Sequence, residues 1–211
     1  CYTDINMARK NIPLVTGEKY HIFNRGVDKR DVFLDQYDYL RFYQSLAFFN
    51  TIEPTVNYRL AKSSYTKQNE KKLVNIEAYS LLPNHFHLIV EQIVDGGISE
   101  FLKRVSGGYT SYFNEKYQRS GVLFQGRYKK VHVNTDEQYQ YLFAYVNENH
   151  IVHRLSHKRE LFHSSSIHYQ KLAISKIIDQ VRSDPYNFVE NKKLAEQIYQ
   201  KRKSMKDLLE T

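Results

Sequence analysis

The sequence predicts an α+β fold, in which an antiparallel sheet carries helices on one side and a helical C-terminal extension follows. Segments with a strand pattern alternate along the chain with segments of helical period. The two central strand segments, 73–82 and 85–91, are separated only by Pro83 and Asn84. So short a connection predicts a hairpin, and therefore antiparallel pairing rather than a parallel crossover unit.

The spacing of apolar residues along the chain predicts the remaining strands and helices. Two further strands are expected at 18–24 and 128–134. Apolar residues three and four positions apart predict helices, which Asp35 and either Thr135 or Asp136 are placed to cap. The expected helices span 36–50, 99–117, 135–149, 169–181 and 188–209.

Two segments are less regular. Residues 51–72 are polar and contain a proline, so we expect a long loop there with at most a short strand at 56–60. The helix at 99–117, for which Ser99 is a candidate cap, contains the glycine pair 107–108. Each glycine costs about 1 kcal/mol relative to alanine in a helix interior. Either the helix begins afresh at Gly108, or the backbone bends or is closely approached there.

The composition indicates a polyanionic partner. The chain of 211 residues carries a formal charge of +8, which favours nucleic acid first and a membrane surface second. Some of its 18 tyrosines could stack on bases, although most are expected to pack the core. No apolar run approaches the length of about 18 residues that spans a bilayer. The one cysteine, Cys1, excludes an internal disulfide and fits a reducing, cytoplasmic setting. We expect a main domain over 12–155 and a basic helical extension over 156–211.

The most distinctive feature is a pair of histidines in the second hairpin strand. Because alternate side chains of a strand share a face, His85, His87, Ile89 and Glu91 point one way and Phe86 points toward the core. The two histidine Cα atoms would lie roughly 7 Å apart, so that both imidazoles can reach one metal ion. A divalent ion there could polarise a phosphate oxygen, and nitrogen ligands suit Mn²⁺ or Zn²⁺ better than Mg²⁺. Two unrelated histidines would explain the pattern equally well.

Such a site also needs a further ligand and a nucleophile. Glu91, Asn114 and Gln118 offer oxygen donors. No serine or cysteine lies in a nucleophile motif. A tyrosine, whose ordinary pKa is about 10, becomes nucleophilic when deprotonated. Cations such as Lys103 and Arg104, or the metal itself, would favour that form.

Four segments, in the same order, resemble the single-tyrosine HUH transposases, and most closely the REP-associated tyrosine transposases. The resemblance extends over about residues 12–150 and is carried by 20–26, 83–88, 109–114 and 121–129. It implies a ferredoxin-like antiparallel sheet with helices packed on one face. It also implies a bacterial, nucleoid-associated enzyme that uses Mg²⁺ or Mn²⁺ to cleave single-stranded DNA beside hairpins of the REP type. Such an enzyme would act as a monomer or a homodimer.

The resemblance implies a role for individual residues. His85 and His87 correspond to the metal ligands, and Tyr109 corresponds to the nucleophile that forms a 5′-phosphotyrosine and a free 3′-OH. Many relatives carry a polar metal ligand four residues after the tyrosine. That position is Phe113 here, so Asn114 is the remaining candidate.

Other residues near these motifs have less specific roles. Tyr112 competes with Tyr109 for the nucleophile role, but we assign its ring to core packing. Several later histidines show no common face and are expected to be incidental, namely His150, His153, His157, His163 and His168. The candidate DNA-binding residues are Asn24, Arg25, Arg104, Arg119, Arg127, Lys129 and Lys130.

Two alternatives remain open at this point. The chain could be a transposase derivative that binds hairpin DNA without cleaving it. It could also be a metal-dependent phosphohydrolase of small nucleotides, although a histidine triad fits poorly because its third histidine would fall at Ile89.

Overall fold

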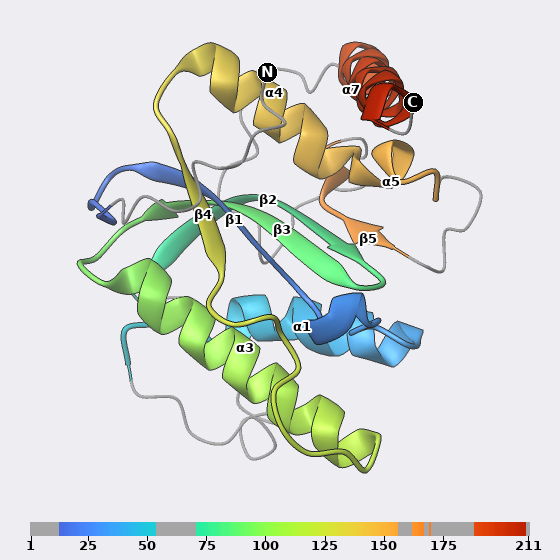
Figure 1. Cartoon of the computed structure of the whole chain (residues 1–211). Coiled ribbons are helices and arrows are strands. Elements are labelled where there is room, and N and C mark those ends of the chain that lie inside the picture. The colour runs from blue at the N-terminus through green and yellow to red at the C-terminus, as the bar shows by residue number, and fades with distance from the viewer. Residues whose placement is uncertain (1–12, 54–70, 156–161, 167–168, 170–187, 210–211) are drawn as a thin grey trace.

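A five-stranded antiparallel sheet forms the centre of the molecule (Figure 1). The computed structural model describes residues 13–53, 71–155, 162–166, 169 and 188–209. The strands are β1 (Lys19–Arg25), β2 (Val74–Leu82), β3 (His85–Gln92), β4 (Lys129–Val133) and β5 (His163–Ser164), in the order β4-β1-β3-β2-β5. The predicted fold class and the central hairpin are confirmed. The strand expected at 56–60, and all but the first residue of the helix expected at 169–181, lie outside the described residues.

Helices cover both faces of this sheet. Figure 1 shows α1 and α3 on one side of the sheet and α4, α5 and α7 on the other. The helices are α1 (Gln36–Phe48), α3 (Gly97–Lys116), α4 (Asp136–Asn147), α5 (Asn149–Val152) and α7 (Phe188–Leu209), with a short 3-10 turn η2 at Val27–Lys29. The expected layer of helices on one face is therefore present, and a second layer covers the opposite face.

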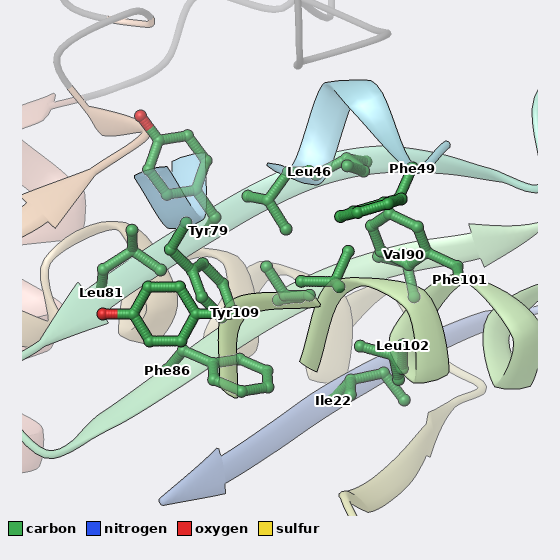
Figure 2. Packing of buried hydrophobic residues seen from close by; sticks show 14 of the residues in the cluster. Ile22, Leu46, Phe49, Tyr79, Leu81, Phe86, Val90, Phe101, Leu102 and Tyr109 are labelled. Atoms are coloured by element: carbon green, nitrogen blue, oxygen red, sulfur yellow. The ribbon is translucent and has the colours of Figure 1, made fainter. Parts of the chain in front are cut away.

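Strand alternation sends neighbouring residues into two separate cores. Ile22 of β1 and Phe86 of β3 pack with α1 and α3 in the first core, part of which Figure 2 shows. Ile89 of β3 packs in the second core with Leu142 and Val146 of α4. A residue's position along β1 or β3 thus decides which helical layer it meets.

Side chains cap two of the helices as expected. The Asp35 carboxylate accepts a hydrogen bond of 3.1 Å from the Asp38 backbone N–H, and the two residues form a capping box. The Thr135 hydroxyl accepts a bond of 3.1 Å from the Gln138 backbone N–H. Ser99 does not cap α3, because the helix starts earlier, after Gly96, whose φ of 67° lies in the left-handed region.

The two consecutive glycines of α3 are part of one unbroken helix. A Cβ atom added to Gly108 would lie 2.9 Å from two ring carbons of Phe49, whereas one added to Gly107 would meet nothing within 4 Å. The second of the two expected explanations is therefore right: α1 and α3 approach closely at Gly108, and the helix does not begin there.

We expect Gly108→Ala to lower the free energy of unfolding relative to Gly107→Ala. Both substitutions gain about 1 kcal/mol of helix propensity. The added methyl at Gly108 overpacks the contact with Phe49, which costs about 1–3 kcal/mol. Urea unfolding of the two variants measures the difference directly, and equal midpoints would contradict the close approach.

Candidate metal and nucleophile site

The predicted histidine pair lies on the sheet face that α4 covers. The His85 and His87 rings are 5.1 Å apart and nearly perpendicular. His21 of β1 joins them, with its Nε2 atom 2.9 Å from Nδ1 of His87. The exposed His153, just after α5, places its ring 4.9 Å from that of His85. The structure thus gathers His21, His85, His87 and His153 into one cluster.

The prediction that the later histidines are incidental is wrong for His153. His150 instead stacks on Phe162, and His163 stacks on Tyr79. His157 and His168 lie outside the described residues.

These imidazoles are neutral at pH 7. Burial lowers the pKa of His21 to about 3. Burial, followed by the neighbouring histidines and then by Arg202, lowers the pKa of His85 to about 3 and holds the pKa of His87 well below its usual value. The pKa of His153 falls to about 4, because its ring loses water on the side that packs against His85 and because Arg202 adds a positive charge. Neutral imidazole is the form that binds a metal ion.

Hydrogen bonds hold one ring nitrogen of each predicted ligand. Asn84 donates its amide N–H to the Lys29 carbonyl, 3.1 Å away, so its oxygen is free to accept from Nδ1 of His85 at 2.6 Å. Nδ1 of His85 therefore carries the proton, and Nε2 keeps a lone pair. Nε2 of His21 occupies Nδ1 of His87 in a hydrogen bond of 2.9 Å, which leaves Nε2 of His87 as the nitrogen for a metal ion. Contacts of this kind orient metal-binding histidines in proteins.

The donor set fits a divalent ion held by two protein nitrogens. In the part of the chain that the structure describes, no group of three His, Cys, Asp or Glu residues is arranged to hold a metal ion. Further ligands would then come from elsewhere, such as the phosphate oxygens of DNA.

Asn114 is not near the histidines, so the structure contradicts its proposed role as a ligand. It lies on α3, across the sheet, where its side-chain oxygen accepts a hydrogen bond of 2.6 Å from Arg119. Glu91 shares a strand face with His87 but lies four residues away, roughly 13 Å along the strand. Its carboxylate accepts a hydrogen bond from Asn75.

The structure places Tyr109 in the first core, on the opposite side of the sheet from the layer that covers the histidines (Figure 1), so it does not bring together the nucleophile and the metal ligands that the resemblance implies. The ring is fully buried among core residues such as Phe86, as Figure 2 shows. Its hydroxyl donates a hydrogen bond of 2.5 Å to the Val32 carbonyl. Burial raises the pKa of Tyr109 far above its ordinary value, which opposes formation of a phenolate. Tyr112 packs against the same core, as expected.

A different tyrosine, Tyr145 of α4, lies on the histidine face. Its ring centroid is 5.4 Å from that of His87 and 6.1 Å from that of His21, in an edge-on arrangement. The partly exposed Phe23 of β1 stacks on His87 from another side, at 5.5 Å. Sequence reasoning missed Tyr145 because its spacing from Leu142 matches an ordinary core stripe. His21 could have been found from the sequence, because alternation along β1 places it on the face opposite to the core residue Ile22.

Some of the candidate DNA-binding residues lie close to this cluster. Arg25 is exposed, stands opposite His85 in the strand register and donates to Gln125 at 2.8 Å. Lys129 of β4 is exposed and stands opposite Phe23, on the same face as the histidines. Arg127, two residues before Lys129, is also exposed. Lys130 stands opposite Ile22 in the strand register and therefore faces the other helical layer.

Three other candidates hold the fold together. The buried Asn24 donates to the Gly126 carbonyl. Arg104 bonds Glu100 and two backbone carbonyls of the segment 51–53. Arg119 bonds the Asn114 side chain and a nearby carbonyl. Arg104 lies on α3, and Arg119 bonds Asn114 of the same helix. Because α3 covers the face opposite the histidines (Figure 1), the structure does not bring Arg104 or Arg119 together with them.

This architecture is the fold of the single-tyrosine transposases. The family model described as "Transposase IS200 like" matches residues 15–149, and the chain belongs to that family. A solved structure of a REP-associated tyrosine transposase bound to a REP hairpin matches with a TM-score of 0.52 and 13% sequence identity, over 82% of this chain and 94% of that chain. The likeness at this identity concerns the fold. No curated protein matches the sequence. None of the helices within the described residues is both long and apolar enough to cross a membrane.

Proposed function

We propose that this chain is a metal-dependent endonuclease and strand transferase that recognises DNA hairpins and cleaves single-stranded DNA beside them. The observation that carries the proposal is that Tyr145 packs against His87, which in turn packs against His85, on one face of the sheet. Membership of the IS200-like transposase family and the net charge of +8 support it. The solved relative in complex with a REP hairpin supports a hairpin as the DNA element recognised.

In the proposed reaction, the Tyr145 oxygen attacks the scissile phosphorus. A bond from that oxygen to phosphorus forms as the bond from phosphorus to the 3′ oxygen breaks. The tyrosine loses its proton and the 3′ oxygen gains one, which gives a 5′-phosphotyrosine and a free 3′-OH. Rejoining reverses these changes, with the 3′-OH of a second end as the attacking group.

His85 and His87 would hold Mg²⁺ or Mn²⁺ through their Nε2 atoms. When bound, the ion would polarise a phosphate oxygen. Asn84 and His21 keep the two rings oriented through their Nδ1 atoms.

The DNA would approach along the ends of β1 and β4. Arg25 and Lys129 are exposed cations on the histidine face and can contact phosphates. Phe23, which is partly exposed and stacks on His87, offers a face for a base next to the scissile phosphate. Because one chain supplies both Tyr145 and the histidines, a monomer would suffice for cleavage.

A covalent adduct tests the proposal. We expect the full chain, incubated with hairpin-bearing single-stranded DNA and Mn²⁺, to form a protein–DNA species that survives denaturing electrophoresis. EDTA should prevent its formation. A chain that binds several hairpins but forms no adduct with Mn²⁺ or Mg²⁺ would instead support the non-catalytic hairpin-binding alternative.

A further inference from the structure

The C-terminal helix α7 brings a cation to the nucleophile proposed above. Ala195 and Ile198 of α7 are buried in the second core, beside α4. Arg202 lies one helical turn beyond Ile198 and reaches Tyr145. Its Nη2 atom donates a hydrogen bond of 3.2 Å to the Tyr145 hydroxyl, and its guanidinium carbon is 5.1 Å from the centre of the tyrosine ring.

The positive charge of Arg202 also acts on the histidines. After burial and the neighbouring histidines, it is a further cause that lowers the pKa of His85 and His87. Across the described residues, no carboxylate lies within salt-bridge distance of Arg202. The residue is exposed on α7. A cation that is exposed, bonds a tyrosine hydroxyl and has no carboxylate of the described residues within salt-bridge distance is suited to bind an anion.

We propose that Arg202 is a catalytic residue that binds the scissile phosphate and holds the Tyr145 hydroxyl beside it. The inference rests on the proposed cleavage reaction and adds a residue to its site. A guanidinium has five N–H donors in a planar fork, so one can contact the Tyr145 oxygen while others contact non-bridging phosphate oxygens. Those oxygens gain charge in the transition state, which a fixed cation stabilises. The family match ends at residue 149, so this role is not carried over from the family segment.

The rate of adduct formation, measured in a single turnover at saturating hairpin DNA and Mn²⁺, tests the role of Arg202. We expect Arg202→Gln and Arg202→Ala to slow the reaction by about 10²–10³-fold, the range seen when one transition-state donor is removed. Hairpin affinity and the melting temperature should change little. Millimolar guanidinium should restore part of the rate of Arg202→Ala and leave the wild-type rate unchanged. Lys203→Gln, which removes a charge from the adjacent position of α7, is the matched control and should react at the wild-type rate.

The outcomes separate this inference from the proposed function. A wild-type rate in Arg202→Gln, with the adduct still formed, would overturn the role of Arg202 alone. A slow Arg202→Ala that guanidinium does not rescue and that melts earlier would show a structural role and would also overturn it. An Arg202 variant that loses only hairpin affinity and keeps the wild-type rate would also overturn the catalytic role. A wild-type chain that forms no adduct with any hairpin would overturn the proposed function, and this inference with it.

Discussion

Tyr145→Phe is expected to abolish the covalent protein–DNA adduct. The substitution removes only the oxygen that would attack phosphorus, and the ring keeps its place against His87 and His21. Loss of the nucleophile should reduce adduct formation by at least about 10³-fold, below detection in a gel assay. Hairpin affinity should persist, because phosphate and stacking contacts lie elsewhere. Mass spectrometry of the wild-type adduct should locate the DNA on Tyr145.

Tyr109→Phe is the matched control for this prediction. The hydroxyl of Tyr109 donates to the buried Val32 carbonyl, so its loss should lower the free energy of unfolding by about 1–3 kcal/mol. The adduct should still form at temperatures where the variant is folded. DNA attached to Tyr109 or Tyr112, or full activity in Tyr145→Phe, would contradict the assignment.

Replacing both His85 and His87 by alanine is expected to abolish cleavage and Mn²⁺ binding together. The two rings supply the nitrogen donors of the proposed site, and the remaining rings of the cluster, His21 and His153, lie on other elements and would not replace the pair. Calorimetric titration with Mn²⁺ measures binding independently of activity. We expect saturable binding to the wild-type chain and none to the double variant, while hairpin affinity is retained.

His132→Ala provides the control for loss of an imidazole. His132 lies on β4, where it contacts the Glu18 carboxylate and stacks on Tyr20, away from the cluster. This variant should bind Mn²⁺ and cleave as the wild type does. Undiminished cleavage by the double variant would remove His85 and His87 from the metal site.

Local patterns were enough to predict most of the elements. The short connection between β2 and β3 allowed little besides a hairpin, and Asp35 and Thr135 cap helices where they were expected to. Alternation along β3 predicted that His85 and His87 share a face, because a strand has a period of two residues in any tertiary setting. The helical period of α3 likewise placed Tyr109 on an apolar stripe with Val105.

The identity of the attacking tyrosine depended on long-range packing. Tyr109 and Tyr145 each lie on an amphipathic helix that can cover a sheet, and nothing local distinguishes the face that each helix covers. That choice follows from the connections between the strands and from the joint burial of α1 with α3 and of α4 with α7. As a result, Tyr145 lies on the sheet face that carries the histidines, and Tyr109 lies on the opposite face. Arg202 reaches Tyr145 across 57 positions of sequence, so only the packing of α7 could reveal the contact. The sequence by itself therefore determined which residues share a face of each element, while the tertiary structure decided which faces meet, because that pairing depends on burial summed over the whole chain.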